Sequence, residues 1–510
     1  MKRILVLLTL GSLVHTAVVT GFASEAGTNR INILFLMDDQ HRGDWIGAAG
    51  AKWMITPNLD RLAHEGVLFR RGYSSTPSCL PARSALLTGM SPWGHGVIGY
   101  APIPERFTVE GPRIFTEAGY RTYSVGKNHY TPLRNLHGYQ TVVLGQHGFF
   151  KRGQDDPDDD YDEWFATQMP GSKPYGNYHS GNDQRGGIHY PFDERLHETR
   201  WVADQAIKFL ENHPTNQPWL LKVSWLRPHA ALNAPKRWYD RYAGVDIPQA
   251  AIGEWARKWY GNVQTTLQKT PEATRGVVPA EEIREMRRSY AAAISFVDEQ
   301  MGRVLEALEK RGELENTLIL FTADHGDVLG DNLLYRKTFS VEGSVNVPMI
   351  VRWPARLGLE AKRGQMRQEL VELRDVLPTF LDAAGLPTPV AVEGKSTLDV
   401  LRGKPWRTML DLEHASCYAP KDGWVALTNQ RYKYVYYTIT GAQQLFDLQN
   451  DPHELRDLAT ESDSAALVKE WRQRMVQQLA IRGDAWVRDG DLVVQPKAML
   501  RRPNAPNVVR

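Results

Sequence analysis

Residues 31–41 read INILFLMDDQH, a nearly unbroken apolar run that stops abruptly at Asp38 and Asp39. Runs of this kind are typical of strands that are buried on both faces of a parallel sheet. Ligands of such sheets collect at the carboxyl ends of the strands. Two adjacent carboxylates at this place repel each other unless a cation neutralises them. The stretch therefore predicts an α/β fold with a metal site at Asp38 and Asp39, and a solvated Asp-Asp turn is the alternative.

Three later runs repeat the pattern of an apolar strand that ends in polar residues. Residues 120–125 precede Lys127 and His129, residues 219–223 precede His229, and residues 317–321 precede Asp324 and His325. The segment 281–311 between them has the apolar spacing of a long amphipathic helix. Strands that alternate with helices predict the α/β class. The two acidic strand ends are expected to surround one divalent cation.

The segment PSCLPARSALLTG at residues 77–89 contains one of only two cysteines in the chain. Pro81 suits the first turn of a helix and Ser78 suits the N-cap position before it. Cys79 would then lie at a helix N-terminus, where free N–H groups and the helix dipole favour an anion. Arg83 adds a permanent positive charge with planar donors. The alternative is a structural cysteine, either buried or joined to Cys417 in a disulfide.

Cys-x-Pro-x-Arg followed by Leu-Thr-Gly resembles the signature of the type I sulfatases of the alkaline phosphatase superfamily. In that family a maturation enzyme oxidises the cysteine to formylglycine, whose hydrated aldehyde is the nucleophile. The resemblance implies that Cys79 is modified in this way. Ala82 and Met90 differ from the serine and arginine that are common at these two positions. The chain is similar to the bacterial carbohydrate sulfatases.

The resemblance also implies a complete active site. One Ca²⁺ would be held by the metal ligands Asp38, Asp39, Cys79, Asp324 and His325, and contact of His325 with the sulfate alone is the alternative. The catalytic residues would be Cys79, Arg83, Lys127, His129, His229 and Lys337. Arg83, Lys127 and Lys337 would offset negative charge on the sulfate oxygens, and His229, with Lys337, would protonate the leaving oxygen. His129 would act as the base when the hydrate collapses to the aldehyde and releases sulfate.

The resemblance implies an alkaline-phosphatase-like fold, in which a central mixed sheet flanked by helices occupies residues 28–395. A smaller α+β domain is expected at residues 396–510. There, short aromatic and β-branched runs at residues 424–427 and 432–437 predict a small antiparallel sheet. His414, near the start of this domain, is predicted to bind the substrate, and a packed or surface histidine is the alternative.

The N-terminus has the pattern of a cleavable signal peptide at residues 1–23. Lys2 and Arg3 precede an apolar run at residues 4–13, and small residues follow at the cleavage site. There is no cysteine near this site for lipid attachment, and no later apolar stretch is long enough for stable membrane insertion. The net charge of +2 does not favour nucleic-acid binding. A periplasmic or secreted protein is expected.

The expected reaction is the hydrolysis of sulfate monoesters, with O-sulfate groups of a glycosaminoglycan, mucin or algal polysaccharide as the substrate. The 15 tryptophans and 20 tyrosines suit a sugar-binding surface, although aromatic residues also fill cores. Two alternatives are a phosphonate monoester or phosphodiester hydrolase of the same superfamily and a catalytically dead, sugar-binding homologue. Residues 153–187, rich in Asp, are expected to form a long irregular segment with a solvated acidic face.

Overall fold

The computed structural model describes residues 30–146, 159–172, 174, 186, 189–267, 269–270, 273–359 and 362–509. The predicted signal peptide lies outside these residues. Within them, a sheet of eight strands has the order β5-β4-β6-β1-β7-β8-β2-β9. Its strands are β1 (Asn32–Asp39), β2 (Val67–Phe69), β4 (Arg121–Gly126), β5 (Thr141–Leu144), β6 (Trp219–Pro228), β7 (Thr317–Ala323), β8 (Met349–Arg352) and β9 (Gln365–Arg367).

Strand β1 is central in this sheet and runs parallel to both of its neighbours, β6 and β7. Strand β4 is parallel to β6, whereas β8 is antiparallel to both β7 and β2. The predicted central mixed sheet is thus confirmed. The carboxyl ends of β1, β4, β6 and β7 meet at one edge, and the polar residues that end these strands are therefore brought together.

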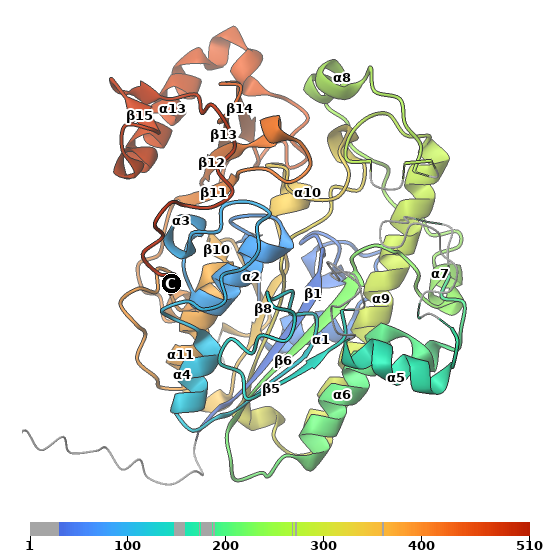
Figure 1. Cartoon of the computed structure of the whole chain (residues 1–510). Coiled ribbons are helices and arrows are strands. Elements are labelled where there is room, and N and C mark those ends of the chain that lie inside the picture. Colours follow the sequence, from blue (N-terminus) through green and yellow to red (C-terminus); the bar gives the residue numbers. More distant parts are fainter. Residues whose placement is uncertain are drawn as a thin grey trace, which may run out of the picture.

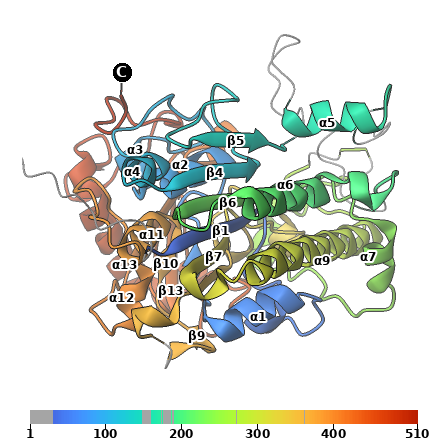
Figure 2. The same ribbon diagram turned by 90° about the horizontal axis from the view of Figure 1, so that it is seen from below.

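Helices cover both faces of the sheet (Figures 1 and 2). One face carries α2 (Cys79–Thr88), α4 (Gly111–Glu117) and α11 (Val376–Ala383), and the other carries α1 (Pro57–Glu65), α6 (Glu198–Asn212) and α9 (Ala280–Lys310). Alternate residues of β1 pack against the two layers, with Phe35 on the first face and Leu36 on the second. Burial on both faces explains why β1 is almost entirely apolar.

A second sheet of four antiparallel strands lies at the top of Figure 1, in orange and red. It consists of β11 (Leu410–His414), β12 (Trp424–Thr428), β13 (Tyr432–Tyr437) and β14 (Gln443–Asp447). One of its faces packs against α13 (Ala465–Leu479), and the other packs against the main body. This confirms the predicted C-terminal α+β unit with an antiparallel sheet, while the boundary at residue 396 remains a prediction.

The other elements are shorter. They are α3 (Pro92–His95), α5 (Asp160–Gln168), α7 (Lys236–Arg241), α8 (Glu254–Tyr260), α10 (Glu342–Val345), α12 (Thr397–Leu401), β3 (Gly72–Tyr73), β10 (Val371–Glu372), β15 (Val487–Arg488) and β16 (Asp491–Leu492). In the described residues, no helix has the length and apolar character needed to cross a membrane.

Helix α5 corrects the expectation of an irregular segment at residues 153–187. The carboxylate of Asp159 accepts a hydrogen bond of 2.9 Å from the backbone N–H of Asp162 and thereby caps the helix. Asp160, Asp162 and Glu163 then occupy the first turn, where negative charge is favourable. The second half of the acidic run, from Asp159 onward, therefore forms the N-terminus of a helix. Residues 147–158, which contain its first half, lie outside the described residues.

Candidate active site

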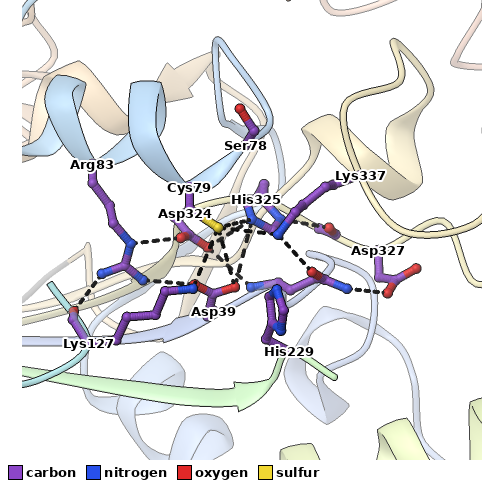
Figure 3. A network of polar contacts seen from close by, with 12 residues as sticks. Asp39, Ser78, Cys79, Arg83, Lys127, His229, Asp324, His325, Asp327 and Lys337 are labelled. Carbon is purple, nitrogen blue, oxygen red and sulfur yellow. Dashed lines mark hydrogen bonds and ion pairs between the residues drawn. The ribbon is translucent and has the colours of Figure 1, made fainter. Parts of the chain in front are cut away.

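The polar residues that end the central strands converge with the N-terminus of α2 on one small, buried region (Figure 3). Ligand atoms of Asp39, Cys79, Asp324 and His325 all lie within 4.8 Å of one another. Asp39 ends β1, Asp324 and His325 follow β7, and Cys79 is the first residue of α2. The structure thus brings together most of the predicted metal ligands from three separate parts of the chain.

The Sγ atom of Cys79 is surrounded by nitrogen donors. It lies 3.2 Å from Nζ of Lys337, 3.3 Å from Nε2 of His325 and 3.6 Å from Nζ of Lys127. Burial raises the pKa of this thiol, but the positive charges of Lys127 and Lys337 outweigh it and lower the pKa below its ordinary value. Position 79 is therefore built to hold an electron-rich group.

Arg83, one turn further along α2, holds the two carboxylates. Its Nη2 lies 3.0 Å from Asp39, and its Nε lies 2.9 Å from Asp324. Its Nη1 donates to the backbone oxygen of Lys127 at 2.7 Å and to the hydroxyl of Ser224 at 3.2 Å. Because all of these partners are protein oxygens, the guanidinium orients the acidic cluster and fastens the loop after β4. Sequence reasoning placed Arg83 on the sulfate instead.

Asp38 lies apart from the group of four. Its Oδ2 is 2.7 Å from Nδ1 of His41, and its Oδ1 is buried with no hydrogen-bond partner among the described residues. Burial raises its pKa, and the nearby charges of Asp324 and Asp39 add to this effect. A buried carboxylate oxygen without a donor needs either a proton or a cation. Asp38 is thus suited to a metal ion, although His41 already holds its other oxygen.

The ring orientations of two histidines are fixed by backbone carbonyl groups. Nδ1 of His229 lies 2.7 Å from the oxygen of Ala230, and Nδ1 of His325 lies 3.0 Å from that of Gly326. In both rings the Nδ1–H group donates to the carbonyl, so Nε2 faces the site. Burial lowers the pKa of His325, but the charge of Asp324 outweighs it and raises the pKa above its ordinary value, so Nε2 of His325 can also carry a proton and donate. Burial and the charge of Lys337 lower the pKa of His229 well below its ordinary value. His229 is therefore neutral in this state of the protein.

Lys127 and His129 are held by the loop that follows β4. Nζ of Lys127 forms an ion pair with Asp39, and the backbone N–H of His129 donates to Oε1 of Gln146 at 3.0 Å. His129 has a positive φ of 58° and packs its ring against Tyr100, with centroids 6.1 Å apart. Burial and then the charge of Lys127 lower its pKa well below the ordinary value. The ring is therefore a base and not a cation.

Gln40 is a site residue that the sequence reasoning missed. Its backbone N–H donates to Oδ1 of Asp324 at 3.2 Å, and its Oε1 accepts from Nζ of Lys337 at 3.1 Å. Its Nε2 donates to Asp327 at 2.5 Å. Gln40 adopts a positive φ of 71°, which turns the chain immediately after β1. The sequence feature that could have indicated this role is the position of Gln40 directly after Asp38 and Asp39.

His414, which is predicted to bind the substrate, lies against the N-terminus of α2. Its side chain is buried, and its Nε2 lies 2.9 Å from Oγ of Ser78, the residue before Cys79. This bond also corrects the expectation that the Ser78 side chain caps α2, because its hydroxyl makes no capping bond. Cys79 and Cys417 are both free, so the structure does not contain the alternative disulfide.

Comparison with known proteins identifies the family. A model described as "Sulfatase" matches residues 31–386, and a model described as "N-sulphoglucosamine sulphohydrolase, C-terminal" matches residues 330–480. The first match covers the whole central sheet and every converging strand end. The chain belongs to the sulfatase family. The predicted membership is thereby confirmed, and this sulfatase is a sulfuric ester hydrolase.

Individual relatives agree with this assignment. An arylsulfatase of Clostridium perfringens is 33% identical over 478 residues, which cover 91% of this chain and 97% of the relative. An N-acetylglucosamine-6-O-sulfatase of Bacteroides thetaiotaomicron is 25% identical and covers 88% of this chain and 86% of its own length. The crystal structure of a phosphonate monoester hydrolase of Agrobacterium radiobacter superposes with a TM-score of 0.74 at 23% identity. It covers 91% of this sulfatase and 100% of that chain, and it shows a shared fold.

Proposed function

We propose that this sulfatase removes O-sulfate groups from a sulfated saccharide, such as a glycosaminoglycan, a mucin glycan or an algal polysaccharide. The observation that carries the proposal is the environment of residue 79. Its side chain has two ammonium groups within 3.6 Å and shares the metal-binding group with Asp39, Asp324 and His325. The relative that acts on N-acetylglucosamine 6-O-sulfate supports the choice of a saccharide. The many aromatic residues are compatible with it.

Residue 79 is proposed to be formylglycine in the active protein, made by a separate maturation enzyme. A hydrated aldehyde supplies two hydroxyl groups on one carbon, so that one can attack sulfur and the other can drive release of sulfate. The nitrogen donors of Lys127, Lys337 and His325 around Sγ suit hydroxyl oxygens at least as well as a sulfur atom. The site therefore fits the modification without a change in the surrounding side chains.

One Ca²⁺ is proposed to be held by Asp39, Asp324 and the unpartnered Oδ1 of Asp38, with His325 beside it. Carboxylate oxygens are the ligands that Ca²⁺ prefers. When bound, the cation would polarise the nucleophile and a sulfate oxygen. Arg83 keeps two of these carboxylates in place through bonds of 2.9 and 3.0 Å. Nε2 of His325 either completes the ligand set or donates to the sulfate.

Lys127 and Lys337 are proposed to offset the charge of the sulfate oxygens, since both ammonium groups flank residue 79. In the protein with cysteine at residue 79, the charges of Cys79 and Asp39 outweigh burial and raise the pKa of Lys337. The charge of Asp39 remains when residue 79 is formylglycine, and it keeps the proton on Lys337. Lys337 can thus give a proton to the leaving oxygen directly or through His229. His129, held neutral by burial, can accept the proton when residue 79 is regenerated.

The remaining predictions complete the proposal. The N-terminal segment 1–23 would act as a cleavable signal peptide and direct the protein to the periplasm or the exterior. Residues 28–395 would form the catalytic domain, and residues 396–510 the smaller C-terminal domain.

Phosphonate monoester hydrolysis is the second candidate, because a hydrolase of that class shares the fold. Sulfate monoesters and phosphonate monoesters both carry one negative charge, so charge alone does not separate them. They differ in shape, since a phosphonate replaces one peripheral oxygen by a carbon substituent. Lys127 is fully buried, pairs with Asp39 and lies 3.6 Å from Sγ of Cys79, so a charged donor flanks the residue that would attack the transferred group. An ammonium group there favours an oxygen.

The deciding experiment compares kcat/KM for 4-nitrophenyl sulfate, 4-nitrophenyl phenylphosphonate and bis(4-nitrophenyl) phosphate. The sulfate ester is expected to be turned over at least about a hundredfold better, equivalent to about 2.7 kcal/mol of transition-state binding. Faster turnover of the phosphonate or the diester would overturn the proposal. Absence of all turnover by protein with formylglycine at residue 79 would favour the catalytically dead homologue.

A further inference from the structure

A cavity of about 230 Å³, separate from the active site, lies between the main body and the end of the C-terminal sheet. Its walls come from the residues after β1, the turn between β2 and β3, helix α10 and the segment after β14. None of its lining residues belongs to the group around Cys79. The charged residues that line it include Arg42, Asp44, Arg70, Arg71, Glu342 and Glu454.

The four carboxylates of this cavity form ion pairs with three cations. Nε of Arg42 lies 2.6 Å from Asp44, and its Nη1 lies 2.9 Å from Asp331, which also pairs with Arg287. Nζ of the buried Lys433 lies 2.8 Å from Glu342 and 2.7 Å from Glu454. Each carboxylate of the wall thus has an ion-pair partner, and one negative charge remains to be offset by Arg70 and Arg71.

Arg70 and Arg71 are different, because neither forms an ion pair with any residue that the structure describes. Nη1 of Arg70 lies 3.4 Å from the amide oxygen of Asn346, and Arg71 contacts the hydroxyl of Tyr73. The charge of Arg70 also contributes, after that of Arg42, to the lowered pKa of Asp44. Both side chains are half-buried. Together with the ion-pair partners outside the wall, five cations face four carboxylates. The wall therefore carries one positive charge in excess, and Arg70 and Arg71 are its two cations without an ion pair among the described residues.

We propose that the cavity is a second anion site, in which Arg70 and Arg71 bind a sulfate group. Guanidinium groups present planar pairs of donors that match the oxygens of a tetrahedral oxyanion. A water molecule needs only about 10–15 Å³ of such space, so this cavity holds far more than a single small ion. The sulfate group could be free sulfate released by the reaction, or it could be carried by a saccharide unit other than the one cleaved. The saccharide source rests on the proposed function.

The cavity is next to the catalytic group but separate from it. The backbone N–H of Arg42 donates to the hydroxyl of Tyr290 at 3.0 Å, and that hydroxyl donates to the backbone oxygen of Gln40 at 2.5 Å. Gln40 in turn contacts Lys337. A ligand bound by Arg70 and Arg71 therefore touches no reacting atom, and removal of these two charges should leave the chemistry on a small substrate intact.

The first test is a crystal of the whole chain soaked in sodium selenate, a sulfate analogue with an anomalous signal. A selenium peak between Arg70 and Arg71 is the expected result. A peak at the active site with none in the cavity would overturn the inference while leaving the proposed function in place. Conversely, a selenium peak in the cavity of a protein that hydrolyses no sulfate ester would support the anion site and contradict the proposed function.

The second test measures binding of sulfate and of N-acetylglucosamine 6-sulfate by calorimetry, with protein that retains cysteine at residue 79 so that the saccharide is not hydrolysed, and measures kcat with the active form. The Arg70→Gln/Arg71→Gln variant is expected to lose one binding equivalent and to keep its kcat on 4-nitrophenyl sulfate within about twofold. The control variant Arg106→Gln/Arg488→Gln removes the same charge from exposed positions and should bind like the wild type. Equal stoichiometry in all three proteins would overturn the inference. If the variant binds one equivalent less of free sulfate, the cavity binds the released product. If it binds one equivalent less of N-acetylglucosamine 6-sulfate, the cavity binds a sulfated saccharide.

Discussion

Nε2 of His414 lies 2.9 Å from Oγ of Ser78, so the first strand of the C-terminal sheet touches the residue before Cys79. The two residues are 336 positions apart in the chain. Burial, followed by the charges of His325 and Lys337, lowers the pKa of His414 to about 3, and the ring is therefore neutral at any assay pH. The contact links the C-terminal sheet to the start of α2, and from it we infer that His414 positions α2.

His414→Ala should lower kcat/KM on 4-nitrophenyl sulfate and on N-acetylglucosamine 6-sulfate by the same factor, about tenfold or 1.4 kcal/mol. The reason is that the lost hydrogen bond fixes the start of α2 and not a part of the substrate. His414→Gln can keep a bond to Ser78 and should retain more activity than the alanine variant. A loss confined to the saccharide would instead make His414 a substrate-binding residue.

Arg83→Met should destabilise the protein as well as inactivate it. The guanidinium is 1% exposed and bridges Asp39 and Asp324, so its removal leaves Asp324 without this cation and Asp39 paired with Lys127. Breaking a buried pair in this way costs about 3–5 kcal/mol, which urea unfolding would measure. Arg195→Met, at an exposed arginine, is the control and should unfold like the wild type. Unchanged stability of Arg83→Met would contradict the positioning role.

Much of this site follows from the sequence because parallel strands end at one edge of the sheet. That rule alone brings Asp39, Lys127, His229 and Asp324 together. The rule does not predict which side chains form hydrogen bonds or ion pairs with one another. Arg83 was assigned to the substrate because its type suits an oxyanion, but two carboxylates inside the protein use the same donors first.

Long-range contacts of the second sheet could not be predicted either. Nothing local to residues 410–414 indicates that β11 ends against Ser78, since strand pattern fixes which face is apolar but not what the sheet packs against. Gln40 shows a related limit, because its role depends on a backbone turn with a φ of 71°. The helix at Asp160–Gln168 was missed because acidic residues were interpreted as a solvated surface and not as a helix start.

Removal of the metal should abolish activity. Asp324→Ala is expected to lose both the bound divalent cation, measured by elemental mass spectrometry, and turnover of 4-nitrophenyl sulfate by at least about a thousandfold. A chelator should produce the same loss in the wild type, and Ca²⁺ should restore it. Asp38→Asn tests whether Asp38 is a ligand of the cation, and this variant should bind the cation less tightly than the wild type. Stoichiometric metal in Asp324→Ala would show that the ligand set is wrong.

Mass spectrometry can directly test the proposed conversion of Cys79 to formylglycine. The tryptic peptide of residues 72–83 should be lighter than its cysteine form and should not react with a thiol-alkylating reagent. Cys417 provides an internal control, because it is free and partly exposed and should be alkylated in the unfolded protein. Full activity of protein whose residue 79 is entirely alkylatable cysteine would contradict the proposal.

Glu198 makes the stability of the fold depend on pH. It is the first residue of α6 and is 1% exposed, close to Arg227 and Asp159. Burial outweighs the charge of Arg227 and raises its pKa from 4.5 to about 8. Between these two values the folded protein keeps a proton that the unfolded chain releases. The free energy of unfolding should therefore fall as the pH rises through this window, by at most about 1.4 kcal/mol per pH unit from this group.

Glu198→Gln removes this titration while preserving the shape of the side chain. Its free energy of unfolding in urea should consequently fall less between pH 5 and pH 8 than that of the wild type, and the variant should be the more stable protein at pH 8. Glu211→Gln, at an exposed position of the same helix, is the matched control and should follow the wild type at every pH. Parallel stability curves for Glu198→Gln and the wild type would mean that Glu198 is ionised in the folded protein, with Arg227 as its counter-charge.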